Sequence, residues 1–243
     1  MQDMTSYVNT VWNITAELYA RQTRKLLFLR EVTFHGWPHV SFVAKNAHRF
    51  AIELKANVAT SEIAGLVHDL NYLVNSDGGA AAGSDLRAKI LSGAGLDNDA
   101  VSVINDVVLS AETRTRGRDI SREAMALSDA DTLFKALPIT PVVLSPLYMR
   151  ETGKSVRELA EKIVSEQVPL RDSEIYFYSE SAKKHYERWA DANLNLWSCI
   201  SESLNDPFVV ELIGEMQQFT DLPVDPVEQR PSMRAPLDRA TKA

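Results

Sequence analysis

Residues 63–74 read IAGLVHDLNYLV, an almost entirely apolar run that is interrupted by the adjacent pair His68 and Asp69. Such a run predicts a buried, central helix. Two ionisable side chains inside it need partners, because burying a polar group without one is costly. A hydrogen-bonded pair that ties two helices together would satisfy them. A metal ion held by both side chains would satisfy them equally well.

Helical periodicity extends outward from this run along most of the chain. Apolar residues recur at helical spacing over residues 7–20 and over residues 40–54, where Pro38 marks the start of the second helix. No alternating strand pattern or hairpin signal stands out, so we predict an all-α fold. Further helices are expected over 86–92, after the N-cap residues Asp97 and Ser121, over 155–167, over 174–204 and from Asp206-Pro207. Loops are expected near residues 75–84, 113–120 and 137–147.

The length of the chain, 243 residues, leaves room for one large domain or for one domain with an extension. We predict a single helical domain over residues 1–220. Prolines gather near the carboxyl end, between Pro223 and Pro236, and proline cannot continue a helix. Residues 221–243 are therefore predicted to be a Pro-rich tail.

Charge and cysteine content limit the classes of protein that the chain can represent. The 33 acidic and 26 basic residues give a formal net charge of −7, which argues against extended nucleic-acid binding but allows a small anionic ligand. The single cysteine, Cys199, fits a reducing compartment. Residues 1–20 lack a signal-peptide pattern, and the uncharged run 136–149 is too short to cross a bilayer. We expect a cytoplasmic protein with no membrane partner.

Four of the five histidines fall between residues 35 and 68. His39 is expected in the first turn after Pro38, with His35 in the loop before it. Asp129 is expected on the apolar side of a later helix. The segments Phe34–His39, Leu66–Tyr72, Ser128–Leu133 and Ala190–Leu194 resemble the HD superfamily of metal-dependent phosphohydrolases, in particular a bacterial HD-domain branch.

This resemblance covers roughly residues 30–200 and implies an HD-domain helical bundle with additional C-terminal helices. It implies that His39, His68, Asp69 and Asp129 bind one divalent transition metal ion. Nitrogen and carboxylate ligands suit Mn, Fe, Co, Ni or Zn, and suit Mg less well. The implied reaction is the hydrolysis of a small phosphate ester, such as a nucleotide, by a metal-activated water. By the same resemblance Asp69 also orients that water, and His35 protonates the leaving oxygen.

The sequence departs from relatives that hold two metal ions, because no histidine lies between residues 69 and 128. We therefore expect a mononuclear site; the other possibility is a second ion held by Glu112. The missing histidines also count against a non-hydrolytic HD-fold metalloenzyme of the oxygenase type. That enzyme and a catalytically silent metal- or ligand-binding module are the two alternative functions.

Three arginines, Arg114, Arg116 and Arg118, alternate in the predicted loop before the Asp129 helix. Guanidinium groups match phosphate geometry, so these residues are candidates for binding a small anionic, phosphorylated substrate. The alternative is a solvated charged loop. Lys135, although close to Asp129 in the sequence, is expected to point elsewhere on its helix. Assembly into a homo-oligomer is compatible with the sequence.

Overall fold

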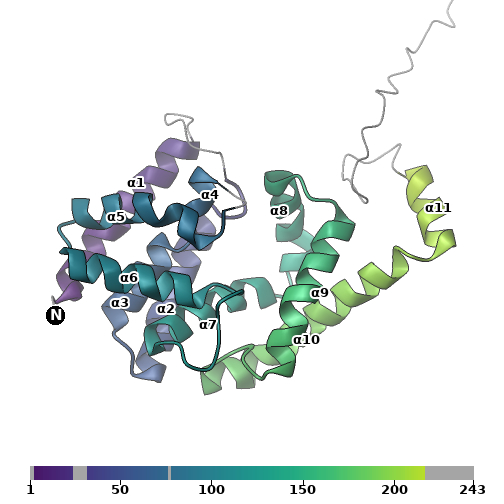
Figure 1. Ribbon diagram of the computed structural model, residues 1–243. Helices are drawn as coiled ribbons and strands as arrows, with labels where there is room; N and C mark the ends of the chain where they lie inside the picture. The colour runs from purple at the N-terminus through teal and green to yellow at the C-terminus, as the bar shows by residue number, and fades with distance from the viewer. Residues whose placement is uncertain (1–2, 24–31, 76–77, 217–243) are drawn as a thin grey trace, which may run out of the picture.

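The computed structural model describes residues 3–23, 32–75 and 78–216, and every regular element in these ranges is helical. The all-α expectation is therefore confirmed. In chain order the α-helices are α1 (Val8–Thr23), α2 (Trp37–Leu54), α3 (Val58–Val67), α4 (Asn71–Val74), α5 (Ser84–Gly93), α6 (Asn98–Ala111), α7 (Arg122–Ala136), α8 (Ser145–Thr152), α9 (Val156–Asp172), α10 (Glu180–Ser203) and α11 (Pro207–Met216) (Figure 1). Short helical turns lie at η1 (Met4–Tyr7), η2 (Ala80–Gly83) and η3 (Thr140–Leu144). The predicted tail, residues 221–243, and the domain boundary at residue 220 lie outside the described residues.

Two helix starts that were predicted from capping residues are confirmed. The side chain of Asp97 accepts a hydrogen bond of 2.8 Å from the backbone N–H of Ala100, and α6 begins one residue after Asp97. The hydroxyl of Ser121 accepts one of 3.2 Å from the N–H of Ala124, and α7 begins at the next residue. Each cap satisfies a backbone donor that the first turn of a helix leaves without a partner.

Two stretches differ from the expected pattern. The run 63–74 is not one helix, because α3 ends at Val67, a turn follows, and α4 begins at Asn71. His68 and Asp69 therefore lie in the turn between two helices. The expected loop 137–147 contains η3 and the start of α8. Its prolines Pro141 and Pro146 occupy first-turn positions, where a missing backbone N–H does no harm.

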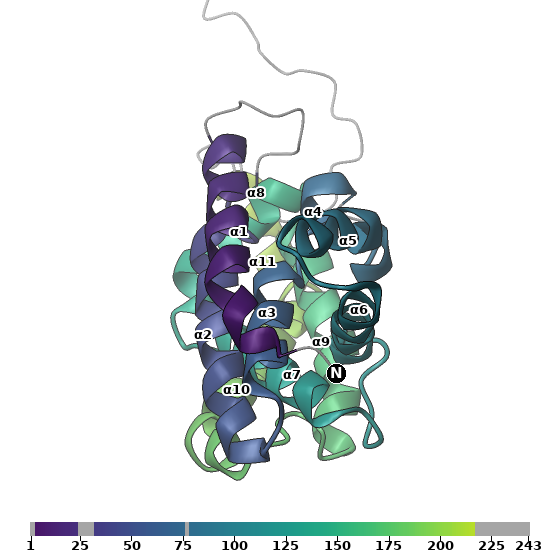
Figure 2. The same ribbon diagram turned by 90° about the vertical axis from the view of Figure 1, so that its left-hand side faces the viewer.

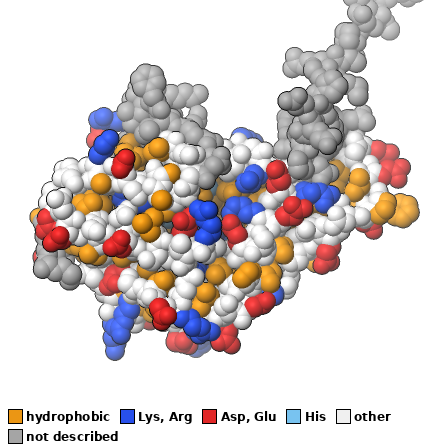
Figure 3. Space-filling model, in the orientation of Figure 1, with side chains coloured by type: hydrophobic (Ala, Val, Ile, Leu, Met, Phe, Trp, Pro, Cys, Tyr) orange, Lys and Arg blue, Asp and Glu red, His pale blue; other side chains and the backbone are white. Residues whose placement is uncertain are grey.

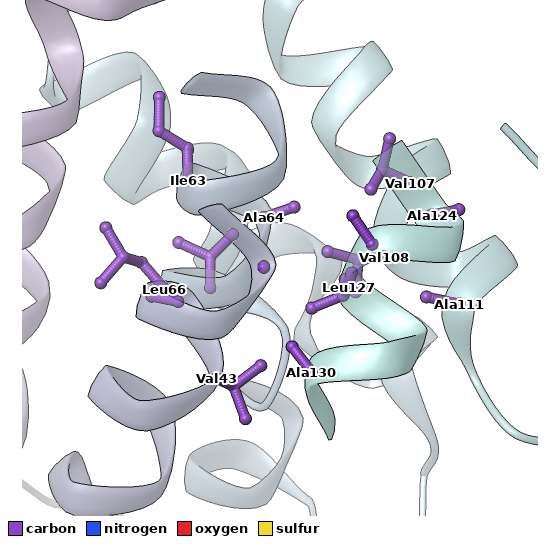
Figure 4. Close-up of a cluster of buried hydrophobic side chains, with 14 of the residues drawn as sticks. Val43, Ile63, Ala64, Leu66, Val107, Val108, Ala111, Ala124, Leu127 and Ala130 are labelled. Carbon is purple, nitrogen blue, oxygen red and sulfur yellow. The ribbon is translucent and has the colours of Figure 1, made fainter. Parts of the chain in front are cut away.

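The main hydrophobic core surrounds α3, as the apolar run predicted. Helix α2 packs against both α3 and α7, while α6 packs against α3 and α7 from another side (Figure 2). Figure 4 shows the side chains that meet there, with Val43 from α2, Leu66 from α3 and Leu127 from α7 among those labelled. This arrangement places the turn after α3 next to the first turn of α2.

Helices α8 to α11 extend from one side of this bundle (Figure 1). Their packing includes a second, smaller hydrophobic cluster made of Met149, Leu159, Ala160 and Trp197. Helix α10 contacts both α9 and α7, so it joins the two parts of the molecule. Among the described helices, none is by itself long and apolar enough to cross a membrane; α7 passes such a test only together with Thr140–Thr152, which is bent from it by 74°. On the face drawn in Figure 3, acidic and basic side chains are interspersed.

Candidate metal centre

Three metal-ligating side chains meet where the start of α2 faces the turn between α3 and α4. The Nε2 atoms of His39 and His68 lie 3.1 Å apart. Oδ2 of Asp69 lies 2.9 Å from Nε2 of His39 and 3.2 Å from Nε2 of His68. The structure thus brings together three of the four predicted ligands.

The packing of α2 against α3 and one backbone hydrogen bond determine this arrangement. Gly65 of α3 faces Ala44 of α2 so closely that a Cβ on Gly65 would stand 2.6 Å from Cα of Ala44. One turn later, Nδ1 of His68 donates a hydrogen bond of 2.8 Å to the carbonyl of Gly65. Because Nδ1 carries the proton, Nε2 of the neutral ring keeps its lone pair for the cluster.

The polar atoms of this cluster suit a cation. Oδ2 of Asp69 and Nδ1 of His39 are buried, and neither has a hydrogen-bond partner among the described residues. Ligands lie about 2.0–2.2 Å from ions such as Zn²⁺, so two ligands at right angles are about 3 Å apart. The three distances between donor atoms, 2.9–3.2 Å, match that spacing. The residues therefore fit one divalent transition metal ion.

The charge states of Asp69 and His39 point the same way, whereas Asp69 and Asp131 raise the pKa of His68 despite its burial. Burial alone would raise the pKa of Asp69, but His68 and His39 outweigh it and hold that pKa well below its ordinary value. Burial lowers the pKa of His39 despite the neighbouring Asp69. An ionised carboxylate and a neutral imidazole are the forms that bind metal.

Asp129, the fourth predicted ligand, does not reach this cluster. It is fully buried in α7, and its two carboxylate oxygens accept hydrogen bonds from the backbone N–H groups of Tyr178 (2.7 Å) and Ser179 (2.8 Å). Asp131, two residues later, lies on nearly the opposite side of the helix. Its Oδ1 is 3.8 Å from Nε2 of His39. The structure thus does not bring Asp129 to the histidines, and Asp131 is the α7 carboxylate that lies nearer to them.

His35 lies beside the cluster, in the segment before α2. Its ring stacks on that of Tyr72, with 3.3 Å between the ring centroids and 9° between the planes. Its Nδ1 donates a 2.5 Å hydrogen bond to Oε1 of Glu151 in α8. Oε2 of Glu151 also accepts the N–H groups of Thr33 (2.7 Å) and Phe34 (2.8 Å). Glu151 therefore fixes both the ring and the backbone of this segment, a role that no local sequence pattern indicated.

A cavity of about 310 Å³ opens in front of the cluster, and His68, Asp69 and Asp131 form part of its wall. Four cationic side chains line it: Arg114, Lys135, Lys154 and Lys162. Lys135 binds Oδ2 of Asp131 at 2.6 Å. Lys135 was expected to point elsewhere on its helix, and no sequence pattern indicated Lys154 or Lys162, which come from the region around α9.

Only one of the three predicted substrate-binding arginines lines this cavity. The guanidinium of Arg114 donates a 2.8 Å hydrogen bond to Glu112, which lines the cavity as well. Arg116 is buried and donates to Oγ1 of Thr132 at 2.8 Å, while Arg118 donates to the carbonyl of Ser173 at 2.6 Å. The backbone forms a turn at residues 112–116 rather than an extended strand, so alternate side chains do not share a face.

The fold and the cluster together define a helical domain with a candidate metal centre, and comparison with known proteins gives its family. Residues 37–135 match the model of the HD domain family, so this part of the chain is an HD domain. The match runs from the first residue of α2 to Lys135 in α7 and includes His39, His68, Asp69 and Asp131. It does not include His35 or α8 to α11.

Two solved structures have a similar fold. The Lin1889 protein of Listeria innocua is 14% identical, with a TM-score of 0.51, and the alignment covers 86% of this chain and 99% of that one. A Lactobacillus plantarum protein is 17% identical, with a TM-score of 0.56, and the alignment covers 86% and 98%. At these identities the likeness shows the fold alone. No curated protein matches the chain.

Proposed function

We propose that the protein is a metal-dependent phosphohydrolase that acts on a small phosphate ester. HD domains usually belong to metal-dependent hydrolases, and this chain contains one. The observation that carries the finer proposal is the wall of the 310 Å³ cavity, where the metal-ligating cluster and four cationic side chains face the same space. Guanidinium and ammonium groups favour a substrate that brings phosphate charge to the metal.

In this proposal His39, His68, Asp69 and Asp131 hold one divalent ion. Mn, Fe, Co, Ni or Zn suits two imidazoles with carboxylates better than Mg does. When bound, such an ion supplies Lewis acidity, which polarises a phosphoryl oxygen and lowers the pKa of a coordinated water. Nδ1 of His68, by donating to Gly65, keeps that imidazole in the orientation that binding requires.

The side chains around the cluster have the other roles in the proposed reaction, which are substrate binding, orientation of water and proton donation. Lys135, Lys154, Lys162 and Arg114 bind the phosphate oxygens, and Asp69 orients the attacking water. The water oxygen forms a bond to phosphorus while the bond from phosphorus to the leaving oxygen breaks. His35 donates the proton that the leaving oxygen takes up, and Glu151 holds the ring in place.

One observation bears on the oxygenase alternative. Two histidines and one carboxylate that lie mutually within about 3 Å also form the donor set of many non-haem iron oxygenases. Four carboxylates, those of Asp69, Glu112, Asp131 and Glu166, line the cavity as well, so it is the four cationic side chains together with the bound ion that favour a phosphate ester over a neutral substrate. Oxygen-dependent turnover with iron, without phosphate release, would select the alternative. Ligand binding without any turnover would select the silent module.

Metal analysis of protein purified without chelator, followed by a phosphatase and nucleotidase screen with Mn, Co, Ni, Mg, Fe and Zn, tests the proposal. We expect about one transition ion per chain and metal-dependent phosphate release. The His68→Ala variant should lose both the bound ion and the phosphate release. His48→Ala is the matched control, because His48 lies on the exposed surface and binds Glu62 at 2.6 Å. Full turnover by a metal-free His68→Ala protein would refute the proposal.

A further inference from the structure

Helix α11 is apolar around most of its circumference, yet none of its residues is buried. No other described helix packs extensively against it, and it lies at the far end of α10, away from the helices of the main core (Figure 1). A helix of 10 residues is marginally stable in water by itself, and a helix this apolar is normally covered by other parts of a protein. Its well-exposed side chains are Phe208 (82%), Val210 (43%), Leu212 (57%) and Met216 (53%).

A second exposed apolar surface lies at η3, between α7 and α8. It consists of Ile139 (54%), Val142 (73%) and Val143 (50%), and we call it the η3 surface. Helix α8 continues directly from η3 and contains Arg150, which is exposed and makes no ion pair with any described residue. The chain thus has two separate apolar surfaces, of which one is followed by an available cation.

The charges of α11 favour a protein over a membrane surface as its partner. Helices that lie on membranes have lysine or arginine on their polar side, which anionic lipids attract. The charged residues of α11 are Glu211 and Glu215, one turn apart and next to Phe208 on the helix surface, and the helix contains no cation. Arg150, beyond the η3 surface, has the complementary charge.

The area of the two surfaces together approaches what a stable dimer needs. At these exposures an apolar side chain offers roughly 100 Å², so α11 supplies about 400 Å² and the η3 surface about 300 Å². Specific interfaces bury about 800 Å² on each partner, which neither surface supplies alone. In a two-fold symmetric pair, where α11 of each copy contacts the η3 surface of the other, each copy buries both surfaces at once.

We propose that the chain forms a two-fold symmetric dimer in which α11 of each copy packs on the η3 surface of the other copy. Glu211 and Glu215 pair with Arg150 of the other copy, which fixes the direction in which α11 crosses that surface. The contact involves neither the metal-ligating cluster nor a substrate. The dimer can therefore be tested independently of the proposed function.

Light scattering after size-exclusion chromatography of the full chain tests the association. We expect a dimer at about 100 µM, and at least about tenfold weaker association in Phe208→Glu and in Val142→Glu, because a charge in an apolar interface is costly. Ile52→Glu is the matched control, because Ile52 is 61% exposed on α2 and belongs to neither surface. Thermal unfolding confirms that each variant is folded. A wild-type chain that is monomeric at about 100 µM would overturn the inference.

Thiol crosslinking of the full chain tests which surfaces meet. Cys199, the only cysteine, is exposed and is first replaced by serine in every sample. Chains with Val142→Cys and chains with Phe208→Cys are mixed and treated with a short bismaleimide. We expect covalent dimers that contain one chain of each kind, and few in either sample alone. Equal crosslinking of Phe208→Cys chains alone would show that α11 packs on α11 of the other copy, and would overturn the pairing with the η3 surface.

Two other results would assign α11 to a different occupant and overturn the dimer. Binding of a monomeric chain to phosphatidylglycerol vesicles, lost in Phe208→Glu, would identify a membrane surface. A monomer in which the backbone amides of α11 are protected from hydrogen exchange would show that residues of the same chain cover this helix.

Discussion

Gly65 and Ala44 hold the two halves of the candidate metal centre together, because α3 and α2 approach most closely where these residues face each other. A Cβ on Gly65 would stand 2.6 Å from Cα and 3.0 Å from the backbone nitrogen of Ala44. The two metal-ligating histidines lie near this contact. His39 lies in the first turn of α2, five residues before Ala44, and His68 follows Gly65 by three residues.

Gly65→Ala should therefore damage both stability and metal binding. The new methyl group meets backbone atoms, which cannot move aside as a flexible side chain would, so α3 must shift away from α2. We expect a loss of about 1–3 kcal/mol in the free energy of unfolding. Metal affinity should fall at least about tenfold, because the donor atoms of His39 and His68 separate. Chemical denaturation in chelator and a metal titration measure the two effects.

Gly93→Ala provides the matched control for this substitution. Gly93 ends α5, and a Cβ there would meet no atom within 4 Å. This change should leave metal affinity unaltered and raise stability by up to about 1 kcal/mol, since alanine loses less backbone entropy than glycine in a helix. Equal metal affinity in the two variants would contradict the role assigned to the Gly65 contact.

The two aspartates of α7 should respond differently to removal of their charge. Asp131→Asn is expected to lower metal affinity at least about tenfold, because an amide oxygen is a poorer ligand than a carboxylate. Asp129→Asn should mainly lower stability, by about 1–3 kcal/mol, because only one of its two acceptors remains for Tyr178 and Ser179. Metal titrations and denaturation in chelator distinguish the effects. A loss of metal affinity in Asp129→Asn but not in Asp131→Asn would identify Asp129 as the ligand instead.

Much of the fold could be predicted from local sequence patterns. Hydrophobic periodicity and the capping residues Asp97 and Ser121 located helices without knowledge of the tertiary structure. The same patterns did not predict the break after Val67, because an apolar run continues through it. They also do not predict α8, because Pro146 follows two other prolines and such a stretch indicates irregular structure, although Pro146 lies in the first turn of the helix.

The site was predictable only where its residues are near one another in the chain or belong to a familiar motif. His39, His68 and Asp69 were found in this way. Which of Asp129 and Asp131 faces the histidines depends on how α7 is rotated about its axis, and both carboxylates stand in the same short segment of the sequence. Glu151 and Lys162 were missed because they come from helices more than 80 residues after His68, and no local pattern links such distant residues.

Glu151 should make stability depend on pH below neutrality. Burial alone would raise its pKa, but hydrogen bonds from His35 and from the backbone of Thr33 and Phe34 outweigh burial and lower that pKa below 4.5. A carboxylate with a lowered folded-state pKa stabilises the fold above its unfolded pKa, and this contribution is lost as the pH falls through the folded-state value.

Glu151→Gln isolates this contribution. The variant should be less stable than the wild type at pH 7, by about 1–3 kcal/mol, because several donors lose a charged acceptor. The difference should stay constant down to about pH 4.5 and shrink at lower pH, where the wild-type carboxylate is protonated too. Urea denaturation in chelator between pH 3 and pH 7 is the measurement. A difference that did not change with pH would show that Glu151 acts through packing alone.

Arg114 and Arg118 should differ in their effect on turnover, although both belong to the same predicted loop. The guanidinium of Arg114 lines the cavity beside the cluster, whereas that of Arg118 is held at the carbonyl of Ser173. Removing a cation that contacts a phosphate weakens substrate binding, so Arg114→Ala should raise KM by about threefold to tenfold. Arg118→Ala should leave KM within about twofold of the wild-type value.

The dependence of KM on ionic strength provides a second comparison of Arg114→Ala with Arg118→Ala. The wild-type KM should rise with added salt, because ions screen the attraction between the cavity's cations and an anionic substrate. Arg114→Ala should show a weaker dependence on salt than the wild type, since one of the screened charges is gone, and Arg118→Ala should keep the wild-type dependence. Steady-state assays at several salt concentrations test this on the best phosphate substrate found in the screen. Equal effects of the two substitutions would mean that the loop acts through its overall charge, and that Arg114 makes no direct contact with the phosphate.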